Sequence, residues 1–212
     1  MPKQILQSIF GYDSFRPLQE DIIAAVLNKQ DTIVLMPTGG GKSLCYQIPA
    51  LAVDGCAIVV SPLISLMHDQ VMALQQLGVS AAVYNSSLSS EQRRDVMDSL
   101  RYGQLKLLYV SPEQLMMDGF LESLPPISLF AIDEAHCISE WGHDFRPSYR
   151  HLSHIKQVFQ NTPIMALTAT ATGRVLGDIQ SQLDMPDAQL FRGSFNRPNL
   201  FYDIRPKKDT YK

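Results

Sequence analysis

Short apolar stretches alternate along the chain with longer segments in which apolar residues recur at helical spacing. The apolar stretches are rich in Ile, Val, Leu and Ala, as expected for strands that are buried on both faces. These predicted strands are residues 31–36, 56–60, 80–84, 105–110, 127–132 and 163–167. Regular alternation of strands and helices predicts an α/β fold of three layers, with a mostly parallel sheet and helices on both faces.

The predicted helices carry their own signals. Apolar residues form one stripe over residues 18–27 and a second over 63–77, each at the spacing of an amphipathic helix. Ser89, followed three residues later by Gln92, predicts a capping box that opens a helix over 90–102.

Composition narrows the class of protein. The 212 residues, 45% of them hydrophobic, fit one large domain or two small ones with an ample core. The net charge of −3 provides no global basic field, so a nucleic acid would be held by a local patch or by backbone N–H groups. Cys45, Cys56 and Cys137 form no Cys-x-x-Cys pair, so we expect buried thiols in a reducing cytoplasm and no zinc site. Neither a signal peptide nor a membrane span is expected.

A glycine-rich loop joins the strand over 31–36 to a helical pattern over 44–51. The loop consists of Pro37, Thr38, Gly39, Gly40, Gly41, Lys42 and Ser43. Glycines allow successive N–H groups to point at one anion, and the following helix adds its positive end. Lys42 supplies a full charge, and the Ser43 hydroxyl can hold Mg²⁺. The general phosphate-loop pattern has glycine where Met36 stands, and a flexible surface turn is the alternative interpretation.

Two carboxylates follow the predicted strand over 127–132. Asp133 and Glu134 begin the sequence Asp-Glu-Ala-His, at a strand end where they would meet phosphates and their metal. Asp133 can hold Mg²⁺ through water, and Glu134 can accept a proton from an attacking water. The alternative is a helix start, since acidic residues favour a first turn.

The two motifs together resemble those of superfamily 2 helicases. The segment 137–149, Cys-Ile-Ser-Glu-Trp-Gly-His-Asp-Phe-Arg-Pro-Ser-Tyr, is similar to the aromatic-rich loop of RecQ-family DNA helicases of bacterial type. The segment 36–47 is also RecQ-like, including Met36, and the resemblance runs from about residue 5 to about residue 202. It implies a RecA-like (P-loop NTPase) fold, ATP and Mg²⁺ as cofactors, and a 3′–5′ DNA helicase of recombination and repair, located at the nucleoid in the bacterial cytoplasm.

The resemblance also implies roles at the nucleotide site. Tyr12, Arg16 and Gln19 match the family's adenine-recognition motif, and a glutamine amide can pair with both polar edges of adenine. The implied catalytic residues are Lys42, Asp133, Glu134 and His136, and the implied metal-binding residues are Ser43 and Asp133. The nucleotide-binding residues are Tyr12, Arg16, Gln19, Thr38, Gly39, Gly40, Gly41, Lys42 and Ser43.

A further set is implied to bind DNA or to couple hydrolysis to DNA binding. It consists of Ser61, Pro62, Ser111, Trp141, His143, Phe145, Arg146, Thr168 and Thr170. Trp141, Phe145 and Tyr149 offer flat faces, and base stacking on such faces is worth about 1–3 kcal/mol per base. The alternatives are that Ser61 and Ser111 only cap helices, and that Trp141 and Phe145 pack in the core.

The expected organisation is an N-terminal helical segment (1–30) packed on a RecA-like lobe (31–200), with a linker (201–212) toward an absent second lobe. We expect this chain to bind ATP–Mg²⁺ but to hydrolyse it very slowly and to unwind nothing, because a second lobe supplies the arginine finger. Implied partners are single-stranded and forked DNA, the second RecA-like lobe of the same polypeptide and, as a candidate, a single-stranded-DNA-binding protein, with no membrane partner. Alternative functions are a non-catalytic nucleotide-gated binding module and an RNA-directed superfamily 2 helicase lobe.

Overall fold

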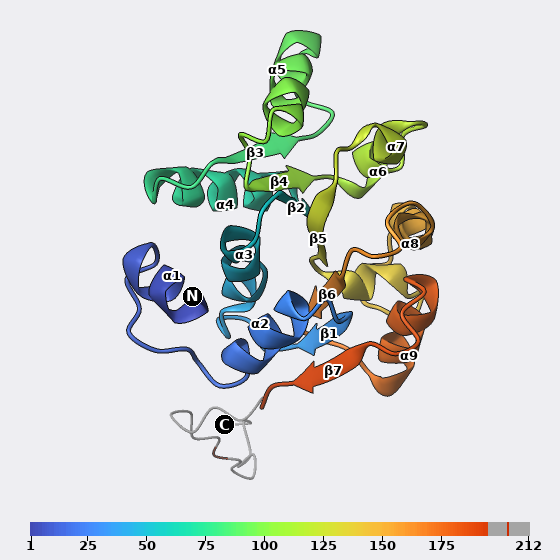
Figure 1. Cartoon of the computed structure of the whole chain (residues 1–212). Helices are drawn as coiled ribbons and strands as arrows, with labels where there is room; N and C mark the ends of the chain where they lie inside the picture. The colour runs from blue at the N-terminus through green and yellow to red at the C-terminus, as the bar shows by residue number, and fades with distance from the viewer. Residues whose placement is uncertain (195–202, 204–212) are drawn as a thin grey trace, which may run out of the picture.

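The computed structural model describes residues 1–194 and residue 203. Within these residues, seven strands form one sheet in the order β3-β4-β2-β5-β6-β1-β7, and every neighbouring pair is parallel (Figure 1). The strands are β1 (Thr32–Leu35), β2 (Cys56–Val60), β3 (Ala81–Tyr84), β4 (Leu107–Val110), β5 (Ile127–Ile132), β6 (Ile164–Thr168) and β7 (Gln189–Arg192). The predicted α/β fold with a parallel sheet is confirmed.

Helices cover both faces of the sheet. The helices on one face are α2 (Gln19–Leu27), α3 (Lys42–Ala52) and α4 (Ile64–Gln76), with α1 (Pro2–Ser8) packed outside α2 and α3. The other face carries α5 (Ser90–Arg101), α6 (Pro112–Leu115), α7 (Phe120–Ser123), the 3₁₀ helices η1 (Ala135–Ile138) and η2 (Pro147–Ser153), α8 (His154–Val158) and α9 (Gly173–Gln182). The sheet is therefore the middle of three layers.

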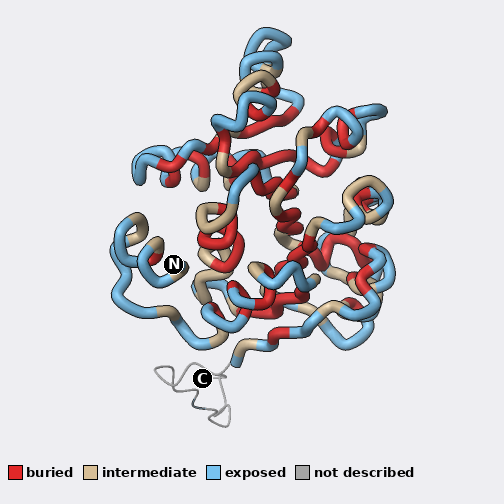
Figure 2. Tube along the Cα trace, in the orientation of Figure 1, coloured by how far each residue is buried: buried red, intermediate tan, exposed pale blue. Residues whose placement is uncertain are grey.

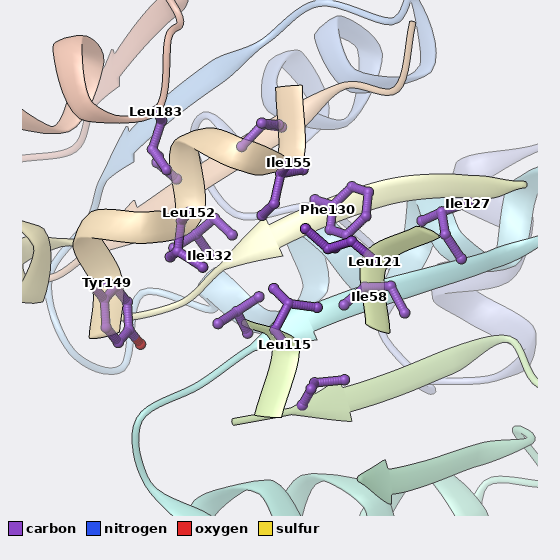
Figure 3. Close-up of a cluster of buried hydrophobic side chains, with 14 of the residues drawn as sticks. Ile58, Leu115, Leu121, Ile127, Phe130, Ile132, Tyr149, Leu152, Ile155 and Leu183 are labelled. Atoms are coloured by element: carbon purple, nitrogen blue, oxygen red, sulfur yellow. The ribbon is translucent and has the colours of Figure 1, made fainter. Parts of the chain in front are cut away.

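The core lies on the two faces of the sheet, where Figure 2 shows buried chain along the central strands. Val59 and Ala131 face the hydrophobic cluster under α2, α3 and α4. Ile58, Phe130 and Ile132 alternate with them and face the opposite cluster (Figure 3). Both sets are fully buried, which explains why these strands read as continuous apolar runs in the sequence.

The elements follow the sequence-based predictions closely, with one strand missed. The capping box of α5 is present, because Ser89 N–H donates to Gln92 Oε1 (2.9 Å) and Gln92 N–H donates to Ser89 Oγ (3.2 Å). The missed strand, β7, is an edge strand in which only Phe191 is buried. A strand with one buried residue carries no apolar run that a sequence pattern could reveal.

The N-terminal segment 1–30 packs on the rest of the fold, because Leu6 of α1 and Ile23 of α2 form a buried cluster with Ile48 of α3. The domain boundaries at residues 30 and 200 stay predictions. The predicted linker 201–212 lies, apart from Asp203, outside the described residues. None of the helices in the described part of the chain has both the length and the apolar character needed to cross a membrane.

Asp31 fixes the start of β1 against both of its neighbours. Its Oδ1 accepts hydrogen bonds from Ile164 N–H (2.8 Å) on β6 and from Lys156 Nζ (2.9 Å). Its backbone oxygen accepts from Gln189 N–H (2.9 Å), at the start of β7. The Asp31–Lys156 ion pair is largely shielded, with 20% and 15% of the two side chains exposed. Asp31 therefore joins the start of β1 to β6 through its carboxylate and to β7 through its backbone oxygen.

We expect Asp31→Ala to lower the free energy of unfolding by about 2–3 kcal/mol. The substitution removes the acceptor of the buried Ile164 N–H and the ion-pair partner of the largely buried Lys156 ammonium group. Urea unfolding followed by circular dichroism measures the change. Lys156→Met is the matched control, since it removes the ion pair but keeps the hydrogen bond to Ile164. Equal losses in the two variants would assign the effect to the ion pair alone.

Candidate functional site

The carboxyl ends of the parallel strands meet at one edge of the sheet, and the sequence-predicted residues follow them there. This edge is where ligands bind in open α/β sheets. The glycine loop follows β1, Asp133 follows β5, and Thr168 ends β6. Ser61 and Ser111 follow β2 and β4. The structure thus brings the two predicted motifs to the same edge.

Backbone conformation explains the glycines of the loop. Gly39 and Gly41 have φ values of 78° and 83°, in the left-handed region that glycine adopts without strain. A Cβ atom on Gly40 would lie 2.8 Å from the Pro37 carbonyl oxygen, and one on Gly41 would lie 2.5 Å from Gln19 Nε2. Bulkier residues would therefore displace the loop from the start of α3.

Lys42 is the first residue of α3, and its ammonium group turns back over the loop. Its Nζ donates to the Met36 carbonyl oxygen (3.2 Å). Thr38 and Gly39 are exposed, whereas Lys42 and Ser43 are half-buried. A positive helix end, a lysine and an open loop together form a site suited to a phosphate chain.

The predicted adenine motif is hydrogen-bonded to the glycine loop. Gln19 Oε1 accepts from Arg16 N–H (2.8 Å), and Gln19 Nε2 donates to the Gly41 carbonyl oxygen (3.0 Å). The Arg16 guanidinium donates to the Gly39 carbonyl oxygen. Gln19 is buried, and its amide keeps one further N–H and one further lone pair. Arg16 and Gln19 therefore stabilise the glycine loop through hydrogen bonds, and they also line the neighbouring cavity.

A cavity of about 260 Å³ opens beside this motif. Tyr12, Arg16, Gln19 and Ser43 contribute polar atoms to its wall, and Tyr12 is 52% exposed. The remaining wall is largely apolar and includes Leu6, Phe10, Leu44, Leu74 and Leu77. A mixed wall of this kind suits a flat heteroaromatic base.

Asp133 and Glu134 occupy the turn after β5. Asp133 N–H donates to the Val60 carbonyl oxygen (2.8 Å), and Glu134 N–H donates to Asp133 Oδ1 (3.0 Å). Burial, reinforced by the charge of Glu134, raises the pKa of Asp133 to about 6, although Lys42 opposes the shift. Strands β5 and β1 are separated by β6 alone, so their ends lie about 9–10 Å apart. The basic loop and the acids thus face each other across a short gap.

Glu134 contacts His136, which in turn contacts Thr168. Its φ of 48° is left-handed, an unusual conformation for a non-glycine residue that is often found at functional sites. His136 Nδ1 lies 3.3 Å from Glu134 Oε2 and 2.9 Å from Thr168 Oγ1. The hydrogen bond with His136 lowers the pKa of Glu134, which keeps it a carboxylate.

Thr168, His143 and Thr170 extend this network away from the acids. Thr168 Oγ1 donates to the Thr170 carbonyl oxygen (3.0 Å) and accepts from Thr170 N–H (3.2 Å). The imidazole rings of His136 and His143 stack with their centroids 4.1 Å apart. Thr170 Oγ1 lies 3.4 Å from His143 Nδ1. Residues predicted separately as catalytic and as coupling residues are therefore in direct contact.

The aromatic loop, residues 137–149, divides its aromatic side chains between surface and core. Trp141 is 61% exposed, which rules out the core position considered as an alternative. Phe145 is half-buried beneath the Arg150 guanidinium, 5.0 Å from its ring centroid. Tyr149 is fully buried at the end of a hydrophobic cluster (Figure 3), and its hydroxyl donates to the Asp133 carbonyl oxygen (3.0 Å). The prediction that Tyr149 offers a face for stacking is wrong, because the ring packs in the core and supports the acidic turn.

The remaining DNA candidates are less accessible than expected. Ser61 and Ser111 are 2% and 7% exposed. Neither side chain caps a helix: α4 begins after Leu63, and Ser111 precedes α6 without a side-chain capping bond. Arg146 donates to the Pro62 carbonyl oxygen (3.0 Å) and pairs with Asp144 (3.3 Å). In this conformation the Ser61 and Ser111 hydroxyl groups are buried, so a ligand at this edge would meet backbone groups of these two turns before it meets the hydroxyls.

Sequence reasoning missed two residues of this site. Arg174 and Asp178, both on α9, contact Trp141 and Ser139 of the aromatic loop. The signal that could have pointed to them is the position of α9, which opens shortly after Thr170.

The family model described as DEAD/DEAH box helicase matches residues 16–179. The chain belongs to this family. It is also 53% identical over 205 residues to a protein of Haemophilus influenzae named ATP-dependent DNA helicase RecQ, covering 96% of this chain and 33% of that relative. Identity to a Bacillus subtilis protein named probable ATP-dependent DNA helicase RecS is 47%, covering 98% of this chain and 42% of the relative. The resemblance to RecQ helicases is confirmed.

Solved helicase structures share the fold. A DUF1998 helicase MrfA structure with bound DNA has a TM-score of 0.70 at 18% identity, covering 90% of this chain and 29% of that one. The Pyrococcus furiosus Hef helicase domain has a TM-score of 0.65 at 19% identity, covering 87% of this chain and 39% of that one. The RecA-like fold is confirmed. The chain spans 33% to 42% of the length of the RecQ and RecS relatives.

We expect Asp133→Asn to stabilise the ligand-free protein at pH 8 and to have little effect near pH 4. The folded-state pKa of about 6 lies above the ordinary 3.8, so the folded protein binds the extra proton between these values. Stability from this group is therefore present at low pH and lost as the pH rises through 6, by about 2–3 kcal/mol.

Thermal unfolding across pH 4–8 measures this difference. Asp118→Asn, at an exposed position, is the control and should leave the profile unchanged. A profile for Asp133→Asn that runs parallel to that of the unmodified protein would contradict the buried-carboxylate assignment.

Proposed function

We propose that this chain is the ATP-binding motor lobe of a 3′–5′ DNA helicase that couples ATP hydrolysis to movement along single-stranded DNA in recombination and repair. The observation that carries the proposal is the shared sheet edge of the Lys42 loop and the Asp133–Glu134 turn. The positive charge of Lys42 acts on both carboxylates. The relatives named ATP-dependent DNA helicases support the same function.

The residues at the edge fit ATP with Mg²⁺. The loop amides and Lys42 would hold the phosphates, with Tyr12, Arg16 and Gln19 at the base. Ser43 and Asp133 offer the oxygen ligands that Mg²⁺ prefers. Held by these residues, Mg²⁺ would neutralise negative charge on the phosphates. A cation there would also favour the ionised form of Asp133, whose pKa burial raises.

In the proposed reaction, Glu134 accepts a proton from the attacking water. Its lowered pKa keeps it ionised, and His136 fixes its orientation through the contact at 3.3 Å. Lys42 exchanges the Met36 carbonyl for phosphate oxygens. An arginine finger from a second lobe contributes about 10³–10⁵ in rate in related enzymes, so slow turnover and no unwinding are expected of this chain alone.

Single-stranded DNA is the proposed polymer, and forked DNA the proposed substrate of the longer motor. Trp141, His143, Phe145 and Arg146 would meet bases and phosphates, while Thr168 and Thr170 would link DNA to the acids. The relatives at about half identity are named DNA helicases, whereas the structure titled hypothetical ATP-dependent RNA helicase is 20% identical and shares the fold. The RNA alternative and the non-catalytic module are therefore disfavoured.

The proposed organisation is segment 1–30, lobe 31–200 and a linker 201–212 toward a second RecA-like lobe. A bacterial cytoplasmic location at the nucleoid, and a single-stranded-DNA-binding protein as a partner, belong to the same proposal. Fusing a second lobe and comparing stimulation of ATP hydrolysis by single-stranded DNA and RNA tests the polymer. Stronger stimulation by RNA would overturn the DNA assignment.

We expect Lys42→Ala to abolish ATP binding, because the phosphates lose their only full charge from the loop. In the unmodified chain, ATP–Mg²⁺ at a hundred times Kd should stabilise the fold by about 2.7 kcal/mol. Thermal unfolding with and without ATP–Mg²⁺ measures the loss. Lys3→Ala, at an exposed position on α1, should keep the full shift. An unchanged shift in Lys42→Ala would remove the phosphate assignment.

We expect Glu134→Gln to preserve ATP binding and to slow hydrolysis by about 10²–10⁴, the usual contribution of a general base. Phosphate release over long incubations, with the second lobe fused where turnover is too slow, provides the rate. Glu91→Gln, exposed on α5, is the matched control. Hydrolysis at the unmodified rate would show that Glu134 is not the base.

A further inference from the structure

Trp141, the only tryptophan of the chain, is held from one side by α9. The Arg174 guanidinium carbon lies 3.6 Å from the centroid of its ring system. The side chain is nevertheless 61% exposed. A cation on one face of an aromatic residue that stays 61% exposed leaves surface on which a second flat group can stack.

The same helix also holds the backbone beneath the ring. Ser139 Oγ donates to Asp178 Oδ2, and Trp141 N–H donates to Ser139 Oγ (3.1 Å). Ser139 is 1% exposed, so this relay is shielded from water. Arg174 and Asp178 are four residues apart and therefore lie on one face of α9. One helix face thus contacts the Trp141 ring and the Ser139 hydroxyl, and this hydroxyl bonds the loop backbone.

The turn beyond Trp141 has no room to adjust. A Cβ atom on Gly142 would lie 2.3 Å from the His136 carbonyl oxygen. Gly142 N–H donates to the Ser139 carbonyl oxygen (2.9 Å). The backbone on both sides of the indole is therefore fixed against the histidine that contacts Glu134.

We propose, resting on the DNA-binding function proposed above, that Arg174 is a positioning residue that fixes the Trp141 indole so that its uncovered surface receives a DNA base. Asp178 supports it by fixing the loop backbone through Ser139. Both residues come from the helix that follows Thr168 and Thr170, so the stacking platform is joined directly to the segment of the coupling threonines. Arg174 acts through the indole and not on a phosphate.

The test compares Arg174→Gln, Arg174→Lys and the exposed control Arg94→Gln in binding a fluorescein-labelled oligo(dT) of about twenty nucleotides. A cation–π contact at an exposed site predicts about two- to five-fold weaker binding for Arg174→Gln. Arg174→Lys should recover part of the loss, and Arg94→Gln should bind as the unmodified chain does. Asp178→Asn should weaken binding in the same direction.

Salt dependence separates positioning from direct phosphate contact. A residue that acts through the indole leaves the slope of log K against log salt unchanged. A residue that neutralises a phosphate of single-stranded DNA lowers the slope by about 0.7. A lowered slope, unchanged affinity or tighter binding in Arg174→Gln would each overturn the proposal, the last by showing that Arg174 competes with the base.

Tryptophan fluorescence reports on the ring itself, because the chain has a single tryptophan. Without DNA, acrylamide should quench Trp141 more strongly in Arg174→Gln than in the unmodified chain, at equal thermal stability and an equal ATP–Mg²⁺ shift. Unchanged quenching would overturn the positioning role. Failure of the unmodified chain to bind oligo(dT) would instead overturn the DNA-binding function and this inference together.

Discussion

The constraint on which the site depends is that every strand of the sheet runs in the same direction. A parallel sheet gathers the carboxyl ends of its strands at one edge, so residues distant in sequence meet there. In the order β5-β6-β1, one strand lies between the strand that leads to Asp133 and the strand that leads to the Lys42 loop. That strand, β6, ends at Thr168, which contacts the histidine of the acidic motif. Strand order alone therefore places the glycine loop, the acids and Thr168 together.

Two acidic residues at this edge of the sheet are in energetically unfavourable environments. Burial raises the pKa of Asp133 to about 6, and Glu134 has a left-handed backbone with φ of 48°. Such features persist only where the surrounding structure determines them. Here the hydrogen bond from Tyr149 to the Asp133 carbonyl, and the contact of Glu134 with His136, provide that support. The buried hydrophobic clusters on the two faces of the sheet offset this cost.

The sequence predicted most of the fold because buried strands leave continuous apolar runs and turns leave glycines. It predicted the glycine loop and the acids at one sheet edge because both directly follow apolar strands. It could not predict β7, where only Phe191 is buried, or the fate of Tyr149, because packing among distant elements decides whether an aromatic side chain is exposed. The bonding of Gln19 to Gly41, and of Arg174 to Trp141, is likewise set by tertiary contacts that no local pattern encodes.

A shared proton connects the acids to Thr168 and Thr170. Thr168 Oγ1 donates its hydrogen to the Thr170 carbonyl, so toward His136 it acts as an acceptor. His136 Nδ1 carries at most one hydrogen, yet it faces both Thr168 Oγ1 at 2.9 Å and Glu134 Oε2 at 3.3 Å. Any displacement of Thr170 changes how well Thr168 Oγ1 accepts the hydrogen of His136 Nδ1. It therefore also changes how strongly this hydrogen stabilises the Glu134 carboxylate. The basicity of Glu134 therefore depends on the position of the segment that follows β6. The same segment leads into α9, which contacts the aromatic loop.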